Sequence, residues 1–554
     1  MPASGIPEEV PVPELSAADA QLREQLLQRA TLVETAKGRE GLEREAGAKF
    51  ERPGRAESGD GGVAAAAAAA SAAALEGKSK VTPLLEEMLT RVRMSPIPMS
   101  EYMSQALAHP KHGYYMSRDV FGEKGDFVTA PEISQMFGEL VGIWVVWMWQ
   151  ALGQPEKVQL VELGPGRGTM MDDMLRSISK FKPLVNALTV ELVETSPALR
   201  DAQRKKLSQG WKEDSREARH AGTGILIRWR DSLEEVPIKK DVPSIMIAQE
   251  FLDCMPVKQF QYTELGWCER MIAEDPTPEG PHHLRYMLSK GPTPSAKMLL
   301  NKSIVPKLPD KPGINEGIEV SPDALWVAQE IGRRVSLTKG AALIIDYGND
   351  GPAVDSVQAM KEHKFVDVLS EPGECDVTAH VDFSAVKKAA LDGSTQDAQE
   401  AAKAAAIAMA ASAEKTSIGG KKSPYHAAVH SAKDGRQGMA PLVVHGPATQ
   451  SVFLHGMGIR ERAQGLLQKA TAAQAEKLQQ EYTRLCSPDE MGTLFKVLAI
   501  TPDSIPEGQA AGFPPPEPEP EQAEPKPEQD SQEGSGTAAA QQDNTAPPAS
   551  SGPA

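Results

Sequence analysis

The chain has 554 residues and a formal net charge of −17, and hydrophobic residues make up 40% of it. Residues 1–60 and 503–554 carry −4 and −9 of that charge, so the region between them lacks the basic face that a nucleic-acid-binding protein requires. The four cysteines form no Cys-x-x-Cys pair, which argues against a disulfide framework or a zinc site, and the longest apolar stretch, residues 140–152, is too short to cross a bilayer.

Three segments have the composition of chain outside a packed core. Residues 1–80 contain a mixed-charge stretch and an alanine run, and we interpret them as a largely disordered leader and linker. Residues 392–440 are predicted to be a low-complexity surface insertion, and the acidic, proline-rich residues 503–554 a disordered tail. The ordered domain is then expected to comprise an N-terminal helical cap over 81–156, a core over 157–391 and the C-terminal part of that core over 441–502.

Between these segments, short apolar runs alternate with helical patterns. The runs expected to be strands are residues 157–163, 188–194, 225–229, 244–248, 341–345 and 494–500. The stretches expected to be helices are residues 169–181, 196–209 and 324–337. Strands that alternate with helices form a mostly parallel sheet with helices on both faces, so we predict an α/β fold with inserted segments.

The most informative stretch is a glycine-rich loop, Glu-Leu-Gly-Pro-Gly-Arg-Gly over residues 162–168, between a predicted strand and a predicted helix. Such glycines allow a tight turn, and the helix start offers free N–H groups to a ligand. The dinucleotide fingerprint would require glycine at position 169, which is Thr169, and no Walker Gly-Lys-Ser/Thr sequence follows. The spacing instead matches the S-adenosylmethionine loop of Rossmann-like methyltransferases, which predicts that Gly164, Pro165, Gly166 and Gly168 bind this cofactor.

Carboxylates follow three successive predicted strands. Glu162 is placed to meet the ammonium group of the cofactor, Glu194 to accept hydrogen bonds from the ribose hydroxyls, and Asp231 to reach the adenine amino group. Because the ends of parallel strands share one edge of a sheet, the three side chains are expected around one crevice. Glu194 has an alternative interpretation as a partner of the Ser196 helix cap.

The fourth predicted strand ends in Gln-Glu-Phe-Leu-Asp-Cys-Met-Pro, residues 249–256. The carboxylates of Glu250 and Asp253 are the candidate catalytic pair, because two such groups can hold a guanidinium and aim one nitrogen at a methyl group. They also localise the guanidinium charge away from the attacking nitrogen. The alternative is a solvated Glu250 and an Asp253 that caps a following helix.

Other conspicuous residues have structural interpretations. Trp144, Trp147 and Trp149 lack basic neighbours, which favours core packing over base stacking. The histidines form no metal-binding pair, so no metal site is expected, and no Gly-x-Ser-x-Gly elbow is present. Asp346 ends a predicted strand, where it either faces an acceptor or forms a structural turn.

Seven short motifs occur in a fixed order over residues 82 to 502. They are His112-Gly113-Tyr114-Tyr115, Gly125–Ser134, Glu162–Gly168, Glu250–Pro256, Leu343–Gly348, Asp376–Phe383 and Phe453–Ile459. As an ordered set they resemble the MidA-like family, whose eukaryotic members are mitochondrial protein arginine methyltransferases that act as complex I assembly factors.

The resemblance implies a Rossmann-like class I methyltransferase core that uses S-adenosyl-L-methionine. It also implies a type II enzyme that symmetrically dimethylates an arginine in a core subunit of mitochondrial NADH:ubiquinone oxidoreductase, complex I, in the mitochondrial matrix. Carried over by position, Gly164, Gly166, Gly168 and Glu194 bind the cofactor, and residues 125–134 close over the cleft. The partner is then a protein, with no nucleic acid and no membrane insertion, and the oligomeric state is left open.

The chain departs from the family pattern in three places. Family members often have Asn-Glu-Phe-Phe-Asp-Ala where residues 249–254 read Gln-Glu-Phe-Leu-Asp-Cys, so both carboxylates are retained. The segment 392–440 has the texture of a lineage-specific insertion. The acidic residues near the N-terminus differ from the Arg-rich, acid-poor start of a mitochondrial leader, so the matrix location follows from the resemblance alone.

Two alternatives to the arginine methyltransferase remain open at this stage. One is an assembly chaperone that keeps the methyltransferase fold with little or no catalysis and uses its tail and insertion for binding. The other is a methyltransferase with a different acceptor.

Overall fold

The computed structural model describes residues 79–117, 128–210, 212, 214–277, 281–395, 439–506 and 509–514. Nearly all of the predicted leader, most of the insertion and of the acidic tail, and residues 125–127 of the predicted cleft-closing segment lie outside these residues.

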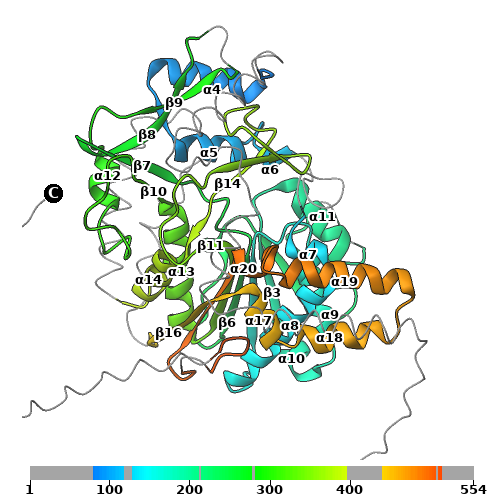
Figure 1. The fold of residues 1–554 in the computed structure, drawn as a ribbon. Coiled ribbons are helices and arrows are strands. Elements are labelled where there is room, and N and C mark those ends of the chain that lie inside the picture. The colour runs from blue at the N-terminus through cyan, green and yellow to red at the C-terminus, as the bar shows by residue number, and fades with distance from the viewer. Residues whose placement is uncertain are drawn as a thin grey trace, which may run out of the picture. The chain divides into compact units, whose positions relative to one another are not determined.

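The main sheet has nine strands within the described chain, in the order β16-β17-β11-β6-β2-β3-β5-β4, with β15 paired to β11 (Figure 1). Their bounds are β2 Val158–Leu163, β3 Leu188–Val193, β4 Glu217–Arg219, β5 Leu226–Arg230, β6 Ser244–Gln249, β11 Ala341–Asn349, β15 Val381–Asp382, β16 Leu442–Thr449 and β17 Phe495–Pro502. The five central strands are parallel to their neighbours, whereas β4, β17 and β16 join antiparallel at the edges. The chain runs from β2 to β3 and β5 on one side and then to β6 and β11 on the other, so the strand order reverses beside β2. In open α/β sheets, ligands bind at this reversal.

Helices cover both faces of the main sheet, as the sequence predicts. The helices that accompany it are α8 Gln135–Ala151, α9 Thr169–Ile178, α10 Lys182–Ala187, α11 Pro197–Leu207, α13 Pro322–Thr338, α14 Phe383–Asp392, α17 Gln450–Gly456, α18 Ile459–Leu467, α19 Ala472–Cys486 and α20 Met491–Leu494. Successive residues of a strand point to opposite faces, so Leu160 and Ile247 pack with α8 and α9, whereas Val161 and Met246 pack with α13 and α14. The predicted α/β fold, with a mostly parallel sheet, is confirmed.

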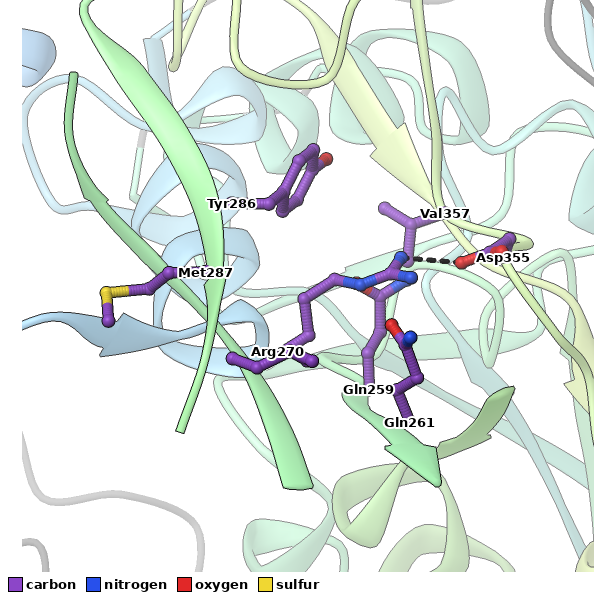
Figure 2. A pocket seen from close by; sticks show the side chains of 8 residues that line it. Gln259, Gln261, Arg270, Tyr286, Met287, Asp355 and Val357 are labelled. Atoms are coloured by element: carbon purple, nitrogen blue, oxygen red, sulfur yellow. Dashed lines mark hydrogen bonds and ion pairs between the residues drawn. The ribbon is translucent and has the colours of Figure 1, made fainter. Parts of the chain in front are cut away.

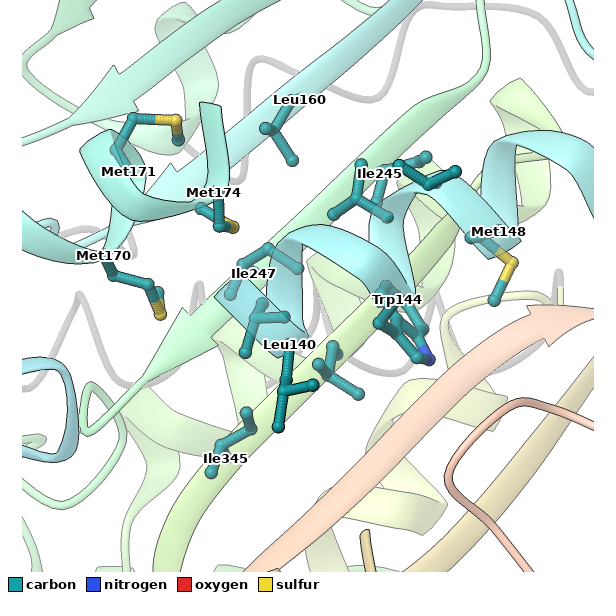
Figure 3. Packing of buried hydrophobic residues seen from close by; sticks show 14 of the residues in the cluster. Leu140, Trp144, Met148, Leu160, Met170, Met171, Met174, Ile245, Ile247 and Ile345 are labelled. Atoms are coloured by element: carbon teal, nitrogen blue, oxygen red, sulfur yellow. The ribbon is translucent and has the colours of Figure 1, made fainter. Parts of the chain in front are cut away.

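Helix α8 is apolar around its whole circumference because other elements enclose it. The Ser134 hydroxyl caps its start by accepting a hydrogen bond from Met136 N at 3.3 Å. Trp144 is fully buried, and Trp149 is 5% exposed in the same cluster. Figure 3 shows Leu140, Trp144 and Met148 of α8 among sheet residues and the methionines of α9. Core packing of the tryptophans is confirmed.

A second, antiparallel layer was not expected from the sequence. Its five-stranded sheet consists of β1 Ile97–Pro98, β7 Lys258–Thr263, β8 Gly266–Glu274, β9 Leu284–Leu288 and β10 Gly317–Val320. A three-stranded sheet consists of β12 Gln358–Lys361, β13 Lys364–Val366 and β14 Asp376–Thr378. The accompanying helices are α4 Pro83–Met94, α5 Met99–Ala108, α6 Tyr114–Ser117 and α12 Pro294–Leu299. The short helix α7 Ala130–Ile133 packs instead with α8, α9 and α19 beside the main sheet. Helices α4 and α5 share a core cluster with this layer, so only part of the expected 81–156 cap belongs with it, and α8 belongs with the main sheet.

The packed part of the chain continues past residue 502. Phe513 is 8% exposed, and its ring lies 5.7 Å from that of Phe453 in α17. Residues 515–554, the larger part of the predicted acidic tail, lie outside the described residues.

Candidate active site

The glycine loop follows β2 and ends where α9 begins, as the sequence predicts. Gly164, Gly166 and Gly168 have φ angles of 63°, 53° and 80°, which side chains rarely tolerate. A Cβ atom on Gly164 would lie 2.7 Å from the ring of Phe251. The loop therefore needs glycine for its backbone conformation, and at Gly164 also for space.

Glu162 lies on β2 just before the loop and is 2% exposed. Burial, and next the nearby charge of Glu194, raise the pKa of Glu162 to about 8. Its Oε2 atom has no hydrogen-bond partner among the described residues. An unpartnered buried carboxyl oxygen is costly, and a cationic ligand group would both pair with it and favour its ionised form.

Glu194 follows β3 at the same edge of the sheet. Its Oε1 atom accepts a hydrogen bond from Ser196 N at 2.8 Å, and its Oε2 atom accepts one from Gln203 Nε2 at 3.2 Å. Burial raises the pKa of Glu194 to about 7 against the effect of these bonds. The contact with Ser196 bears out the structural interpretation, and a carboxylate oxygen has lone pairs left for ribose hydroxyls.

Gln203 on α11 was not singled out from the sequence. Besides its bond to Glu194, its Nε2 atom donates to the carbonyl oxygen of Gly166 at 2.7 Å, and its Oε1 atom accepts from Trp229 Nε1 at 2.9 Å. This side chain joins the loop, the end of β3 and β5. A polar residue on the buried face of α11 was the one available signal in the sequence.

Asp231 directly follows β5, as expected, but its carboxylate is already paired. It forms ion pairs with Arg200 and with Arg216, the latter at 2.9 Å. Although partial burial acts in the opposite direction, these arginines lower the pKa of Asp231. The adenine contact stays a prediction, and two arginines that the sequence analysis did not consider compete for this side chain.

These residues fit S-adenosylmethionine. The loop backbone is open to a close ligand, Glu162 has an unpartnered buried oxygen, and Glu194 can accept bonds from a diol. A cofactor with a sulfonium and an ammonium group suits buried carboxyls whose pKa burial has raised. The sequence-predicted Gly164, Gly166, Gly168, Glu162 and Glu194 are brought together.

Glu250 begins the second half of the site, at the end of β6. Its φ of 48° is unusual for a non-glycine residue, and such strain often occurs at functional sites. Its Oε1 atom accepts hydrogen bonds from Ala130 N at 3.0 Å and from Gln249 Nε2 at 2.7 Å. Burial raises the pKa of Glu250 to about 7. Glu250 is therefore held in place by residues near it and is not a solvated side chain.

Asp346, at the equivalent position on β11, organises the turn that carries the second predicted carboxylate. Its Oδ2 atom accepts hydrogen bonds from the backbone N–H groups of Phe251, Leu252 and Asp253 at 3.1, 2.8 and 3.2 Å. Its side chain thus has a structural role, while burial and the charge of Glu250 raise the pKa of Asp346 to about 7.

Asp253 itself is 7% exposed, and no helix follows it, because the next element is β7. The capping alternative is therefore wrong. Burial, and next the charges of Asp346 and Asp376, raise the pKa of Asp253 well above its usual range.

Asp376 on β14 completes a group of four carboxyls, of which Asp253, Asp346 and Asp376 are buried and Glu250 is partly buried. Asp376 opens one of the seven sequence motifs, but nothing in the sequence places it beside the other three. Tyr115 of α6 donates a hydrogen bond from its hydroxyl to Asp376 Oδ1 at 2.7 Å. Glu250, Asp253, Asp346 and Asp376, here called the carboxyl cluster, influence one another electrostatically. Glu250 and Asp253 follow β6, Asp346 lies within β11, and Asp376 begins β14. The cluster also meets the glycine loop, since Phe251 packs against Gly164.

The described part of the chain lacks two further kinds of feature. It contains no group of three or more His, Cys, Asp or Glu side chains arranged to hold a metal ion. Nor does any of its helices have the length and apolarity that crossing a membrane requires.

Comparison with known proteins agrees with this geometry. Residues 140–401 match a family model described as "Putative S-adenosyl-L-methionine-dependent methyltransferase". Two structures of a COG1565 superfamily protein from Burkholderia thailandensis, one with S-adenosyl-homocysteine bound, share the fold at 22% identity with TM-scores of 0.52 and 0.53. These alignments cover 79% of this chain and 96% and 97% of the solved chains.

The fold and site define an S-adenosylmethionine-dependent methyltransferase with a Rossmann-like core. Among curated relatives, the protein arginine methyltransferase NDUFAF7, mitochondrial, of Rattus norvegicus is 35% identical over 433 residues, 76% of this chain and 85% of that protein. The Homo sapiens protein of the same name is 34% identical over 439 residues, 77% of this chain and 85% of that protein. The chain belongs to this family, and the resemblance to MidA-like proteins is confirmed.

Proposed function

We propose that this methyltransferase transfers methyl groups to a protein arginine, with symmetric dimethylarginine as the product. The observation that carries the proposal is the carboxyl cluster, which lies beside the cofactor loop and brings four carboxyl groups within electrostatic reach of one another. A guanidinium is permanently protonated and matches carboxylates bidentately. The names of the curated relatives support the same acceptor.

The bound cofactor would supply an electrophilic methyl group on a sulfonium. Glu250 and Asp253 would ionise as the guanidinium enters, because its charge offsets the burial that raises their pKa. Their carboxylates would hold the guanidinium charge on two nitrogens while the third takes the methyl group, the bond from the methyl carbon to sulfur breaking so that S-adenosylhomocysteine leaves. The methylated nitrogen then loses one proton, and the ionised Glu250 carboxylate is the proposed acceptor for it.

The acceptor protein and the compartment are also part of the proposal. We infer that the substrate is a core subunit of complex I, methylated in the mitochondrial matrix during assembly. The support is the family membership and the word mitochondrial in the relatives' names.

The decisive variant is Glu250→Gln, because glutamine keeps an oxygen that can accept from Ala130 N and Gln249 but has no charge. Purified full-length protein would be incubated with S-adenosylmethionine and separately expressed complex I core subunits. Mass spectrometry would locate the product, and loss of methylamine on fragmentation identifies the symmetric isomer. We expect kcat to fall about 100-fold or more, with cofactor affinity within about twofold of wild type.

Glu264→Gln is the matched control, since Glu264 is exposed in the β7–β8 turn. Methylation of lysine, or of no core subunit, would contradict the proposed acceptor. Full rescue of complex I assembly in a deletion strain by an inactive Glu250→Gln protein would instead support the assembly chaperone.

A further inference from the structure

A hollow lies on the antiparallel layer, and its lining contains none of the residues of the methyl-transfer site. Its volume is about 520 Å³, which is within the range of ligand-binding pockets. The lining side chains are Gln259, Gln261, Arg270, Tyr286, Met287, Leu288, Asp355 and Val357. Figure 2 shows them coming from β7, β8, β9 and the segment before β12.

The charged groups of this hollow compensate one another. Arg270 forms an ion pair with Asp355 at 2.5 Å, and its guanidinium lies 5.7 Å from the centre of the Tyr286 ring. Tyr286 is nevertheless 41% exposed, which is high for a large aromatic side chain. Val354, which precedes Asp355 in the sequence, is 49% exposed. Amide groups, an aromatic ring and apolar edges with no net charge suit an uncharged polypeptide better than a phosphate or a nucleotide.

One extended segment separates the hollow from the acceptor half of the active site. Asp355 and Val357 line the hollow. Ser356 and Gln358 alternate with these residues and make contacts away from the hollow. The Ser356 hydroxyl contacts Glu319 and accepts a hydrogen bond from His380 N at 2.9 Å. Gln358 Nε2 donates a hydrogen bond to the Tyr347 hydroxyl at 3.4 Å.

The polar contacts continue from the hollow to the carboxyl cluster. Gln259 Nε2 donates to Glu319 Oε1 at 2.7 Å, and the same oxygen accepts from Ser356 N at 2.9 Å. His380, which is bonded to Ser356, packs edge-on against Tyr347 with ring centres 5.2 Å apart. Tyr347 directly follows Asp346 of the cluster. The hollow and the acceptor half of the site therefore share a wall.

Gln259 adds an observation that points to a ligand. It is 5% exposed, and its Oε1 atom has no hydrogen-bond partner among the described residues. The bond from Nε2 to the Glu319 carboxylate fixes which end of the amide is the oxygen, since a carboxylate can only accept. A bound chain that displaces the neighbouring side chains would supply the missing N–H group, as backbone amides do.

We propose that this hollow binds an extended, uncharged segment of the acceptor protein, at a distance from the residue that is methylated. Backbone amides of that segment bond to the carboxamides of Gln259 and Gln261, and an apolar side chain packs on Tyr286. The assignment of the bound chain to the acceptor rests on the proposed protein-directed function; the capacity to bind an extended peptide does not. Tyr286 and Gln261 are then residues that determine specificity.

The first test uses the full-length protein and a display library of random peptides of about 12 residues, each roughly 40 Å long when extended. Selected peptides are titrated against wild type, Tyr286→Ala, Gln261→Ala and the control Arg285→Ala. Arg285 adjoins Tyr286 on β9, is exposed, and points to the other face of the strand. We expect Tyr286→Ala to weaken binding about tenfold or more and Arg285→Ala to leave it unchanged. If no selected peptide depends on Tyr286 or Gln261, the hollow is not a peptide site.

The second test links the hollow to methyl transfer. A core-subunit peptide that the enzyme methylates is compared with a version trimmed to about five residues around the arginine, at most roughly 18 Å long when extended. We expect Tyr286→Ala to raise KM for the long acceptor about tenfold and to leave kcat, and the kinetics of the short acceptor, as in wild type. Equal effects on both acceptors, or none, would overturn the link. If core-subunit peptides bind at Tyr286 but none of them receives a methyl group, the proposed function is contradicted. The assignment of the hollow as a peptide-binding site is then retained.

Discussion

Gln203 donates a hydrogen bond to the carbonyl oxygen of Gly166, at 2.7 Å, from a helix that begins beyond the next strand. The same amide group reaches Glu194. The shape of the cofactor loop and the direction of the expected ribose-binding carboxylate therefore depend on one side chain.

Gln203→Ala should weaken S-adenosylmethionine binding about tenfold, because the loop carbonyl and Glu194 lose a shared donor and Trp229 loses its acceptor. Calorimetric titration measures the change. Gln209→Ala is the control, since Gln209 is exposed just after the same helix. If the two variants bind the cofactor equally well, Gln203 does not organise the loop.

Stability of the cofactor-free protein should fall as the pH rises from about 5 to 8. In the folded protein the pKa of Glu162 is raised to about 8 and that of Glu194 to about 7. In the unfolded chain both have a pKa near 4.5. At a pH between the unfolded and folded pKa values, the unfolded chain has therefore released protons that the folded chain retains. The contribution of these two carboxyls to the free energy of unfolding is fully present below pH 4.5. It is lost as the pH rises through their pKa values in the folded protein. Each pKa unit corresponds to about 1.4 kcal/mol. Urea unfolding at several pH values should show a clearly flatter pH dependence for Glu162→Gln.

Binding of S-adenosylmethionine at pH 7 should release up to about one proton, because a cationic ligand lowers the raised pKa of Glu162. Calorimetry in two buffers of different ionisation enthalpy gives the number of protons. Glu162→Gln should abolish most of the release, and Glu264→Gln should not change it. S-adenosylhomocysteine, which keeps the ammonium but lacks the sulfonium charge, tests which group is responsible. Equal release from wild type and Glu162→Gln would place the titrating group elsewhere.

Tyr115→Phe should impair use of the acceptor without affecting the cofactor. The variant keeps the ring and removes the hydroxyl that donates to Asp376 at 2.7 Å. We expect KM for the acceptor to rise between about three- and tenfold, with an unchanged cofactor Kd and melting temperature within a few degrees of wild type. Tyr262→Phe on β7 is the matched control. A loss of cofactor affinity would mean that Tyr115 acts on the other half of the site.

Two glycines in helices should respond oppositely to alanine. A Cβ atom on Gly332 of α13 would lie 1.9 Å from the carbonyl oxygen of Ala390, whereas one on Gly465 of α18 would have no atom within 4 Å. Gly332→Ala should therefore lower the free energy of unfolding by at least about 1 kcal/mol. Gly465→Ala should stabilise it by about 0.5–1 kcal/mol. Urea denaturation checks both, and a stable Gly332→Ala protein would show that α13 and α14 can separate.

The main sheet could be predicted from the sequence because its central strands are buried on both faces. Such strands are short, continuous apolar runs, as in β2 and β6, and they stand out between helical patterns. The strands of the antiparallel layer mix buried and exposed residues. Lys258–Thr263, for example, contains two glutamines and a lysine, and one of its two partners, β10, is short and distant in sequence.

The cofactor half of the site was likewise accessible from the sequence, because a loop and the ends of consecutive strands obey a positional rule. The sequence does not predict the roles of Gln203, Tyr115 and the two arginines that pair with Asp231. Each of these side chains reaches the site from another element, so its position depends on tertiary packing. Asp346 was noticed, but its three backbone partners are about 95 residues away along the chain.

The ring of Phe251 occupies the space that a side chain on Gly164 would fill. The cofactor loop and the turn after β6, which carries Glu250 and Asp253, thus meet at one aromatic ring. This contact can be used for chemical labelling. Phe251→Ala would open a gap beside the loop, and a sulfonium cofactor analogue with an enlarged transferable group could enter it. A cell that carries this variant would then mark the natural acceptors of this enzyme with a clickable tag, while other methyltransferases would ignore the bulky reagent.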